Sequence, residues 1–191
     1  MRQQIGRLFA ASIAVKRQFL RDNLSTLIEA IELIAAALRA GHKLLLFGNG
    51  GSAADAQHIS AEFINRFKIE RAPLPAIALT TDTSTLTSIA NDYGYTEVFA
   101  KQIQALGRPG DVAMAISTSG NARNVLRGVA ACRRLGVRTI ALTGGTGGKL
   151  AAAADLVLRV GGTAETARIQ ETHILVAHVI CEQVDTLLFP G

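Results

Sequence analysis

Leu44-Leu45-Leu46-Phe47-Gly48-Asn49-Gly50-Gly51-Ser52 is the most informative segment of this chain. Its apolar half is long enough for one buried strand, and its glycines let the backbone approach a ligand closely. A helix is predicted directly after it, and the start of a helix offers unpaired N–H groups and a positive dipole end to an anion. Strand, glycine loop and helix in this order predict an anion site.

The helix predicted after the glycine loop carries three side chains of catalytic type on one face. At ~100° per residue, Asp55, His58 and Glu62 share that face. His58 and Glu62 are one turn apart, a spacing at which both can reach one metal ion or one substrate carbon. Asp55 either orients the His58 imidazole or is a solvated acid that complements the helix dipole.

Apolar runs alternate with helical patterns along the chain. This alternation predicts an α/β fold, a doubly wound sheet of about five parallel strands flanked by helices, with two N-terminal helices. No linker divides the chain, so residues 1–191 are expected to form a single domain. The predicted strands are 43–47, 75–79, 111–116, 137–142 and 156–160, and the predicted helices are 3–20, 24–40, 53–66, 83–90, 121–135, 148–153 and 165–187.

Composition limits the classes of partner. The net charge is +5, but the basic residues are scattered and few aromatics accompany them, so nucleic acid is not expected. No stretch approaches the length of a membrane span, so no membrane partner is expected. Cys132 and Cys181 are far apart and predict reduced, buried thiols in a cytoplasmic protein.

Ligands of open parallel sheets bind beyond the carboxyl ends of the strands, which selects the loops at 48–52, 80–84, 117–121 and 143–149. Ser117-Thr118-Ser119-Gly120-Asn121 places three hydroxyls before a predicted helix. A helix cap uses only one hydroxyl, so this loop predicts a phosphate site. The loop at 143–149 fails as a nucleotide-binding P-loop, because Leu150 follows its lysine.

Two further patterns leave alternatives open. Gly48-x-Gly50-x-x-Ala53 satisfies a loose dinucleotide fingerprint, with Asp82 as the ribose acid, but that hypothesis leaves the hydroxyl cluster and the histidine face unexplained. On the final predicted helix, Gln170 and His178 are ~12 Å apart along the axis. To share one ion, both side chains must lean inward, or they serve different subunits.

Over residues 40–189 these motifs resemble the sugar isomerase (SIS) family, and within it the phosphoheptose isomerases. The resemblance rests on Gly48 to Ser52, Asp55-x-x-His58-x-x-x-Glu62, Asn91-Asp92, Ser117 to Asn121, and Arg168-Ile169-Gln170-Glu171-x-His173 followed by His178. Ala122 departs from the family pattern, because a serine is common there, and this bears on one phosphate contact.

The resemblance implies an aldose–ketose isomerase that converts sedoheptulose 7-phosphate to D-glycero-D-manno-heptose 7-phosphate through an enediol. This reaction would be the first step towards the ADP-heptose of the lipopolysaccharide core. Glu62 and His178 would transfer the proton, and zinc would be held by His58, Glu62, Gln170 and His178. The implied substrate contacts are Asn49, Gly50, Gly51, Ser52, Glu62, Asn91, Asp92, Ser117, Thr118, Ser119 and Gln170.

A second group in the same family is similar over the whole length and supplies an alternative, a non-catalytic phosphosugar-binding protein that binds the replication initiator DnaA. That group lacks the acid and the final histidine, which are present here as Glu62 and His178, so the isomerase interpretation is preferred. The apolar faces of the first 40 residues and of the final helix predict packing against other subunits. The resemblance implies a homotetramer, and we expect composite sites in it.

Overall fold

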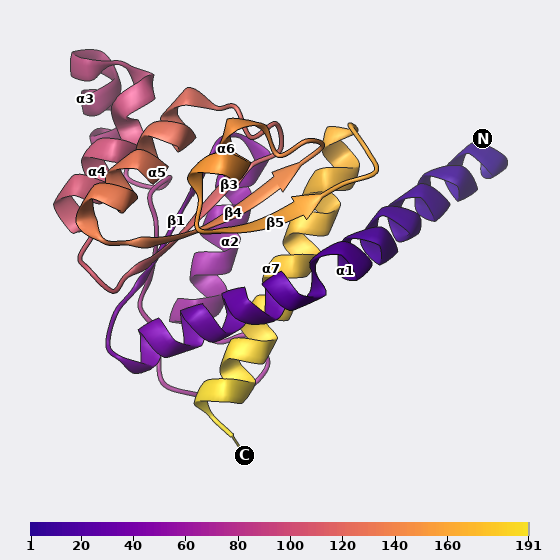
Figure 1. Ribbon diagram of the computed structural model, residues 1–191, viewed down its shortest axis with the longest axis horizontal. Coiled ribbons are helices and arrows are strands. Elements are labelled where there is room, and N and C mark those ends of the chain that lie inside the picture. The colour runs from indigo at the N-terminus through magenta and orange to yellow at the C-terminus, as the bar shows by residue number, and fades with distance from the viewer. Residues whose placement is uncertain (191) are drawn as a thin grey trace.

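The computed structural model describes residues 1–190, and its helices and strands alternate along the chain (Figure 1). In order, they are α1 (Arg2–Arg39), β1 (Leu44–Gly48), α2 (Gly51–Ile64), β2 (Ala76–Ala78), α3 (Thr83–Tyr93), the 3-10 helix η1 (Tyr95–Glu97), α4 (Val98–Leu106), β3 (Val112–Ser117), α5 (Arg123–Leu135), β4 (Arg138–Gly144), α6 (Gly148–Ala153), β5 (Leu156–Val160) and α7 (Thr166–Leu188).

The five strands form one parallel sheet in the order β2-β1-β3-β4-β5, which confirms the predicted fold class. Strand β2, which follows β1 in the chain, lies on one side of β1, and β3 lies on the other side. Register pairs Gly48 of β1 with Ile116 of β3, so the two loops that follow these strands lie next to each other. Such a reversal of strand order is where open α/β sheets bind ligands.

Helices cover both faces of the sheet, which explains the unbroken apolar run of β1 (Figure 1). Leu44 and Leu46 pack in a core with α1, α2 and α7. Leu45 and Phe47 point to the opposite face and pack in a second core with α4 and α5. The alternation along one strand therefore builds both halves of the interior.

The structure corrects the prediction of two N-terminal helices, because α1 is continuous from Arg2 to Arg39. Asn23, between the two predicted segments, is buried, and its side-chain amide donates to the carbonyl of Phe19 at 2.9 Å and to that of Arg159 in β5 at 3.2 Å. The Arg159 N–H donates in turn to Asn23 Oδ1 at 3.1 Å. The polar residue therefore anchors an unbroken helix to the edge strand rather than ending it.

A second correction concerns residues 91–110, where no element was predicted. The structure has η1 and α4 there. Glu97 precedes α4 without a side-chain cap bond, and the helix is nine residues long, so its local signal is weak. Val98, Phe99 and Ile103 bury one face of α4 in the core beside α5, and this tertiary contact stabilises the helix.

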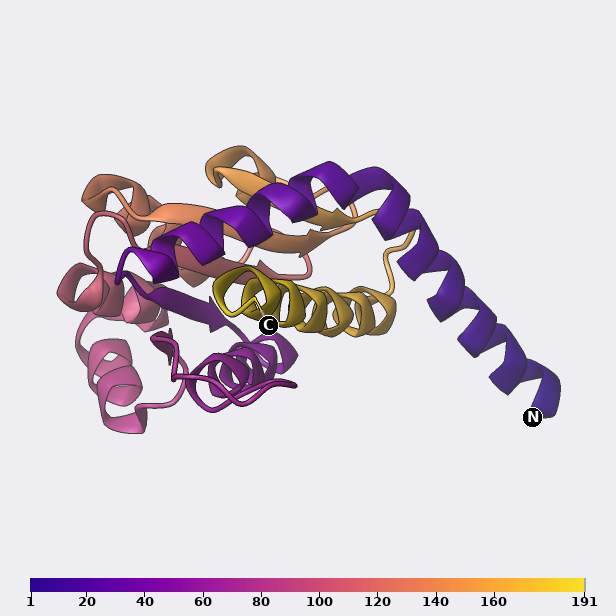
Figure 2. The same cartoon turned by 90° about the horizontal axis from the view of Figure 1, so that it is seen from below.

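The N-terminal half of α1 projects away from the rest of the molecule (Figure 2). Among residues 1–190, none of the helices is both long enough and apolar enough to cross a lipid bilayer. Cys132 and Cys181 are both buried and unpaired, as predicted, and burial raises the pKa of each thiol to about 12.

Candidate active site

The loops after β1 and β3 enclose a small cavity at the predicted anion site. Its volume is about 170 Å³, and it is lined by Asn49, Ser52, Ile116, Ser117, Thr118, Ser119 and Ala122. Helix α5 starts after Ala122 without a side-chain cap bond, so the hydroxyls do not serve as its cap. Hydroxyls and a helix start facing one cavity form a site suited to an oxyanion.

Close packing explains the glycines of both loops. A Cβ on Gly48 would lie 2.8 Å from the Ile116 carbonyl oxygen, so any side chain there would push β1 and β3 apart. Gly50 has a φ of +55°, which disfavours other residues. A Cβ on Gly120 would overlap the carbonyl of Gly147. The absence of a side chain at Gly120 therefore lets the loop at 143–149 pack against the hydroxyl loop.

Asn124 also supports the cavity, although the sequence analysis did not identify it. Its buried side chain exchanges two hydrogen bonds with Asn49: Asn49 Nδ2 donates to Asn124 Oδ1 at 2.9 Å, and Asn124 Nδ2 donates to Asn49 Oδ1 at 2.8 Å. The Tyr95 hydroxyl also donates to Asn49 Oδ1, at 3.3 Å. These bonds hold the Asn49 side chain at the rim of the cavity.

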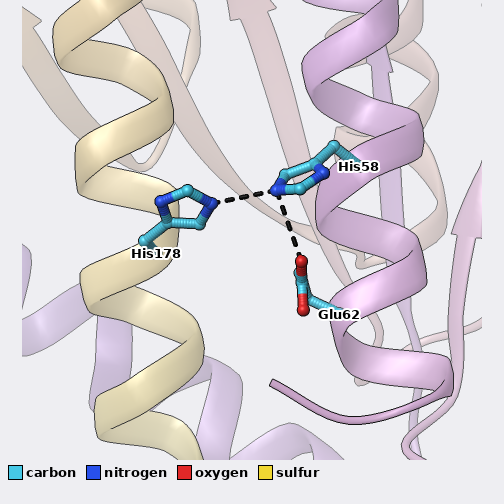
Figure 3. Close-up of side chains that lie close together, drawn as sticks. All are labelled: His58, Glu62 and His178. Carbon is cyan, nitrogen blue, oxygen red and sulfur yellow. Dashed lines mark hydrogen bonds and ion pairs between the residues drawn. The ribbon is translucent and has the colours of Figure 1, made fainter. Parts of the chain in front are cut away.

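His58, Glu62 and His178 converge between α2 and α7 (Figure 3). The His58 and His178 Nε2 atoms are 2.9 Å apart, and His58 Nε2 is 3.3 Å from Glu62 Oε1. One potential ligand atom from each residue lies within 4.8 Å of the others. Among the residues that the structure describes, this is the one group of three or more histidine, cysteine or acidic side chains so arranged. All three come from one chain.

These donors fit a zinc ion. Two imidazole nitrogens and a carboxylate oxygen are common zinc ligands, and two ligand atoms of one tetrahedral zinc are about 3.3 Å apart. The observed separations of 2.9 and 3.3 Å are close to that value. Three protein donors also leave a position for a further ligand, as in catalytic zinc sites.

Gln170 lies at the glycine loop, near the start of α2. A Cβ on Gly51 would lie 3.0 Å from Gln170 Cδ, so the amide packs directly against that glycine. This position agrees with its expected role in substrate binding. Its expected role as a fourth metal ligand stays a prediction.

Asp55 stands one turn before His58 on α2, as predicted from the spacing. Its Oδ2 is buried without a hydrogen-bond partner in the part of the chain that the structure describes. Burial raises the pKa of the Asp55 carboxyl, and the nearby His58 opposes that rise. The half-buried position argues against the interpretation of Asp55 as a fully solvated acid, and no hydrogen bond joins it to the imidazole.

Asn91 and Asp92 do not line the cavity. They are exposed near the C-terminal end of α3, where Asn91 Nδ2 donates to Asp92 Oδ1 at 2.9 Å. Asp82, the acid of the dinucleotide hypothesis, is the N-cap of α3 and accepts from the Thr85 N–H at 2.9 Å. A structural role therefore accounts for Asp82.

Comparison with known proteins finds one family model and several similar proteins that agree with each other. The family described as "SIS domain" matches residues 8–144. The phosphoheptose isomerase of Aquifex aeolicus is 51% identical over 188 residues, which cover 98% of each protein. Among solved structures, the phosphoheptose isomerase from Neisseria gonorrhoeae is 46% identical with a TM-score of 0.91, over 97% of this chain and 98% of that one. That from Francisella tularensis is 39% identical with a TM-score of 0.92, over 96% and 97%.

Proposed function

The chain belongs to the SIS domain family, and from that premise we propose that it is an aldose–ketose isomerase acting on sedoheptulose 7-phosphate. The observation that carries the proposal is the convergence of Glu62 and His178 in the same domain as an oxyanion cavity. The name of the similar proteins supplies the substrate class, a phosphorylated heptose, and the family resemblance supplies the ketose. The product would be D-glycero-D-manno-heptose 7-phosphate, a precursor for lipopolysaccharide, made in the cytoplasm.

The spacing of the site supports a long substrate. The open-chain sugar carries its phosphate at one end of its carbon chain and the reacting carbons C1 and C2 at the other end. His58 follows Gly51 by two turns of α2, or ~10 Å along the axis. With the phosphate held by Ser117, Thr118 and Ser119, a heptose chain would extend towards the cluster rather than end at the loops.

The reaction requires one protein group that removes a proton from the sugar and one that returns a proton to it. C1 of the ketose loses a proton, C2 gains one, and the hydroxyl proton moves from O1 to O2 by way of an enediol. A carboxylate and an imidazole can take and return these protons. We assign both steps to Glu62 and His178, while Asn49, Gly50, Gly51, Ser52 and Gln170 hold the substrate.

Zinc would be held by His58, Glu62 and His178, and Gln170 would join them as a fourth ligand when its amide turns from Gly51 towards the cluster. When bound, the ion would polarise the carbonyl of the sugar, which is worth several kcal/mol of transition-state stabilisation. Asp55, whose charge interacts with His58, is the candidate for orienting the His58 imidazole as a zinc ligand.

Conversion of sedoheptulose 7-phosphate by the pure protein is the direct test of the proposed function. Glu62→Gln should reduce kcat by a factor of about 10² to 10⁴, because the amide keeps the size of the side chain but cannot accept the proton. The measurement is steady-state turnover with the aldoheptose phosphate detected as product.

Asp82→Asn is a matched control, because it changes an acid that serves only as a helix cap. Near wild-type turnover in Glu62→Gln would contradict the assignment of that residue. A wild-type protein without isomerase activity that instead captures the replication initiator would favour the non-catalytic alternative.

Metal content provides a second prediction. Gentle purification should yield roughly one zinc per chain, and chelation should remove both the metal and the activity, with zinc restoring them. The measurement is elemental analysis alongside turnover. Full activity in metal-free protein would show that the same residues work by acid–base chemistry alone.

A further inference from the structure

Arg71 lies between α2 and β2, and its guanidinium bridges the two helices that carry the cluster. Nε donates to Asp185 Oδ1 on α7 at 2.9 Å, and Nη2 donates to the main-chain carbonyl of Glu62 on α2 at 2.9 Å. Nη1 donates to the carbonyl of Phe63 at 2.7 Å. One planar group therefore holds the last turn of α2 against α7.

The pair formed by Arg71 and Asp185 is buried, with side chains that are 2% and 5% exposed. Burial removes both charges from water, so such a pair contributes little net stability compared with apolar side chains of the same volume. Asp185 Oδ2 has no hydrogen-bond partner within residues 1–190, which adds to that cost. What the pair does provide is a defined geometry, because the guanidinium fork donates in fixed directions.

One end of the bridge contacts Glu62, and the other end lies on the helix that carries His178. Arg71 binds the carbonyl of Glu62 itself. Asp185 follows His178 by seven residues, two turns further on the same face of α7. Phe67, from the same segment as Arg71, stacks on the His178 imidazole with ring centroids 5.4 Å apart and planes at 24°.

We propose that Arg71 is a positioning residue for this site, which sets the placement of Glu62 relative to His178 through its bonds to α2 and α7. The role in turnover rests on the proposed function, whereas the role in placing the three side chains does not. Without the fork, the end of α2 can shift along α7, and the segment that carries Phe67 loses its support.

Arg71→Lys tests the proposal, because lysine keeps the charge opposite Asp185 but cannot donate to both helices in the same fixed directions. Glu70→Gln is the matched control. Glu70 lies in the same segment, but its side chain is 88% exposed and pairs with Arg66 at 3.6 Å, so this pair contributes little.

Four quantities are measured well below the melting temperature: kcat, KM, zinc affinity and the ring NMR signals of the histidines, of which the chain has four. In Arg71→Lys we expect kcat and zinc affinity to fall about 10- to 100-fold, as for other residues that orient metal ligands. KM should stay within about twofold, because the cavity loops do not contact Arg71. The signals of His58 and His178 should move while that of His42 stays. Glu70→Gln should leave all four unchanged.

A lower melting temperature in Arg71→Lys with unchanged kcat, zinc affinity and histidine signals would show a merely structural role and overturn the proposal. If the wild type does not isomerise the substrate, the proposed function fails, and the His58 and His178 signals still decide the role of Arg71. If Arg71→Lys does not fold, Asp185→Ala is the second variant, which removes the acceptor of the Nε bond and so detaches the guanidinium from α7. Unmoved His58 and His178 signals in that variant would also overturn the proposal.

Discussion

At the scale of single residues, His173 shows how burial can outweigh a hydrogen bond in determining a protonation state. Its Nε2 lies 3.2 Å from the carbonyl oxygen of Thr143, to which it donates, and its Nδ1 is buried without a partner in the described chain. Burial lowers the pKa of this imidazole from 6.5 to about 4. The side chain is therefore neutral at pH 7 and packs α7 against β4 instead of taking part in the cluster.

The lowered pKa of His173 predicts a loss of stability in mild acid. Between pH 6.5 and pH 4 the unfolded chain binds a proton at this histidine and the folded chain does not, so the free energy of unfolding falls as the pH falls through that window. The expected loss from this group is about 2 kcal/mol between pH 7 and pH 5. Urea unfolding at both pH values and at one protein concentration measures it.

His173→Gln is the matched variant, because its amide can still donate to the Thr143 carbonyl but does not titrate. It should be less stable than the wild type at pH 7 and should lose about 2 kcal/mol less on acidification to pH 5. An equal loss in both proteins would mean that His173 does not govern the acid response.

At the scale of elements, α1 has two roles along its 38 residues. Its second half packs on β5 and α7, and Phe19, Leu27 and Ile34 belong to the core. Its first half extends beyond the sheet (Figure 2). The change occurs near Asn23, the residue that is hydrogen-bonded to β5.

Asn23→Ala should therefore weaken the attachment of α1 to the edge strand. It leaves the Arg159 N–H and carbonyl without their side-chain partners, and losing such partly buried bonds costs about 1 to 3 kcal/mol. Urea unfolding measures the loss, and hydrogen exchange should show faster exchange at the Arg159 amide. The neighbouring exposed Asp22→Ala is the control, and equal effects of the two changes would contradict the role of Asn23.

At the scale of the whole molecule, apolar surface remains uncovered on α1 and α7. Phe9 is 69% exposed, and Leu8, Ile13 and Leu20 are each about half exposed. A groove of about 340 Å³ runs between the two helices and is lined by Ile13, Lys16, Arg17, Phe19, Leu20, Leu27, Thr172, Leu175, Val176 and Val179. Exposed apolar surface of this extent is typical of an interface between subunits.

We therefore keep the prediction of a homotetramer in which residues 1–40 contribute to the interface. Light scattering at working concentration should give four times the chain mass, and a monomer would contradict the prediction. Phe9→Asp should shift the assembly towards smaller species, because it places a charge in the apolar contact, whereas Arg2→Asp changes charge at the tip of the same helix and serves as control.

Composite sites can be tested by mixing inactive subunits. Glu62 and His178 converge within one chain, so mixing Glu62→Gln with His178→Ala subunits should restore no activity. The family resemblance implies that Asp92 contacts the substrate, yet Asp92 lies outside the cavity of its own chain, and the two agree if it reaches a site of another subunit. Mixing Glu62→Gln with Asp92→Ala subunits should then restore activity in about a quarter of the sites, as random assembly predicts. No recovery would place Asp92 outside the site.

The sequence by itself determined the sheet, the loops and the pairing of His58 with Glu62. These features depend on local patterns: an apolar run makes a strand, glycines make a turn, and a spacing of four residues puts two side chains on one face of a helix. The family resemblance, and no local pattern, implied that His178 meets them, and the structure brings the three together in one chain. That α1 is one helix and that Arg71 bridges α2 and α7 became known only from the tertiary structure. Such contacts join residues far apart in the chain, and their geometry depends on how the helices pack on the sheet, which no local pattern encodes.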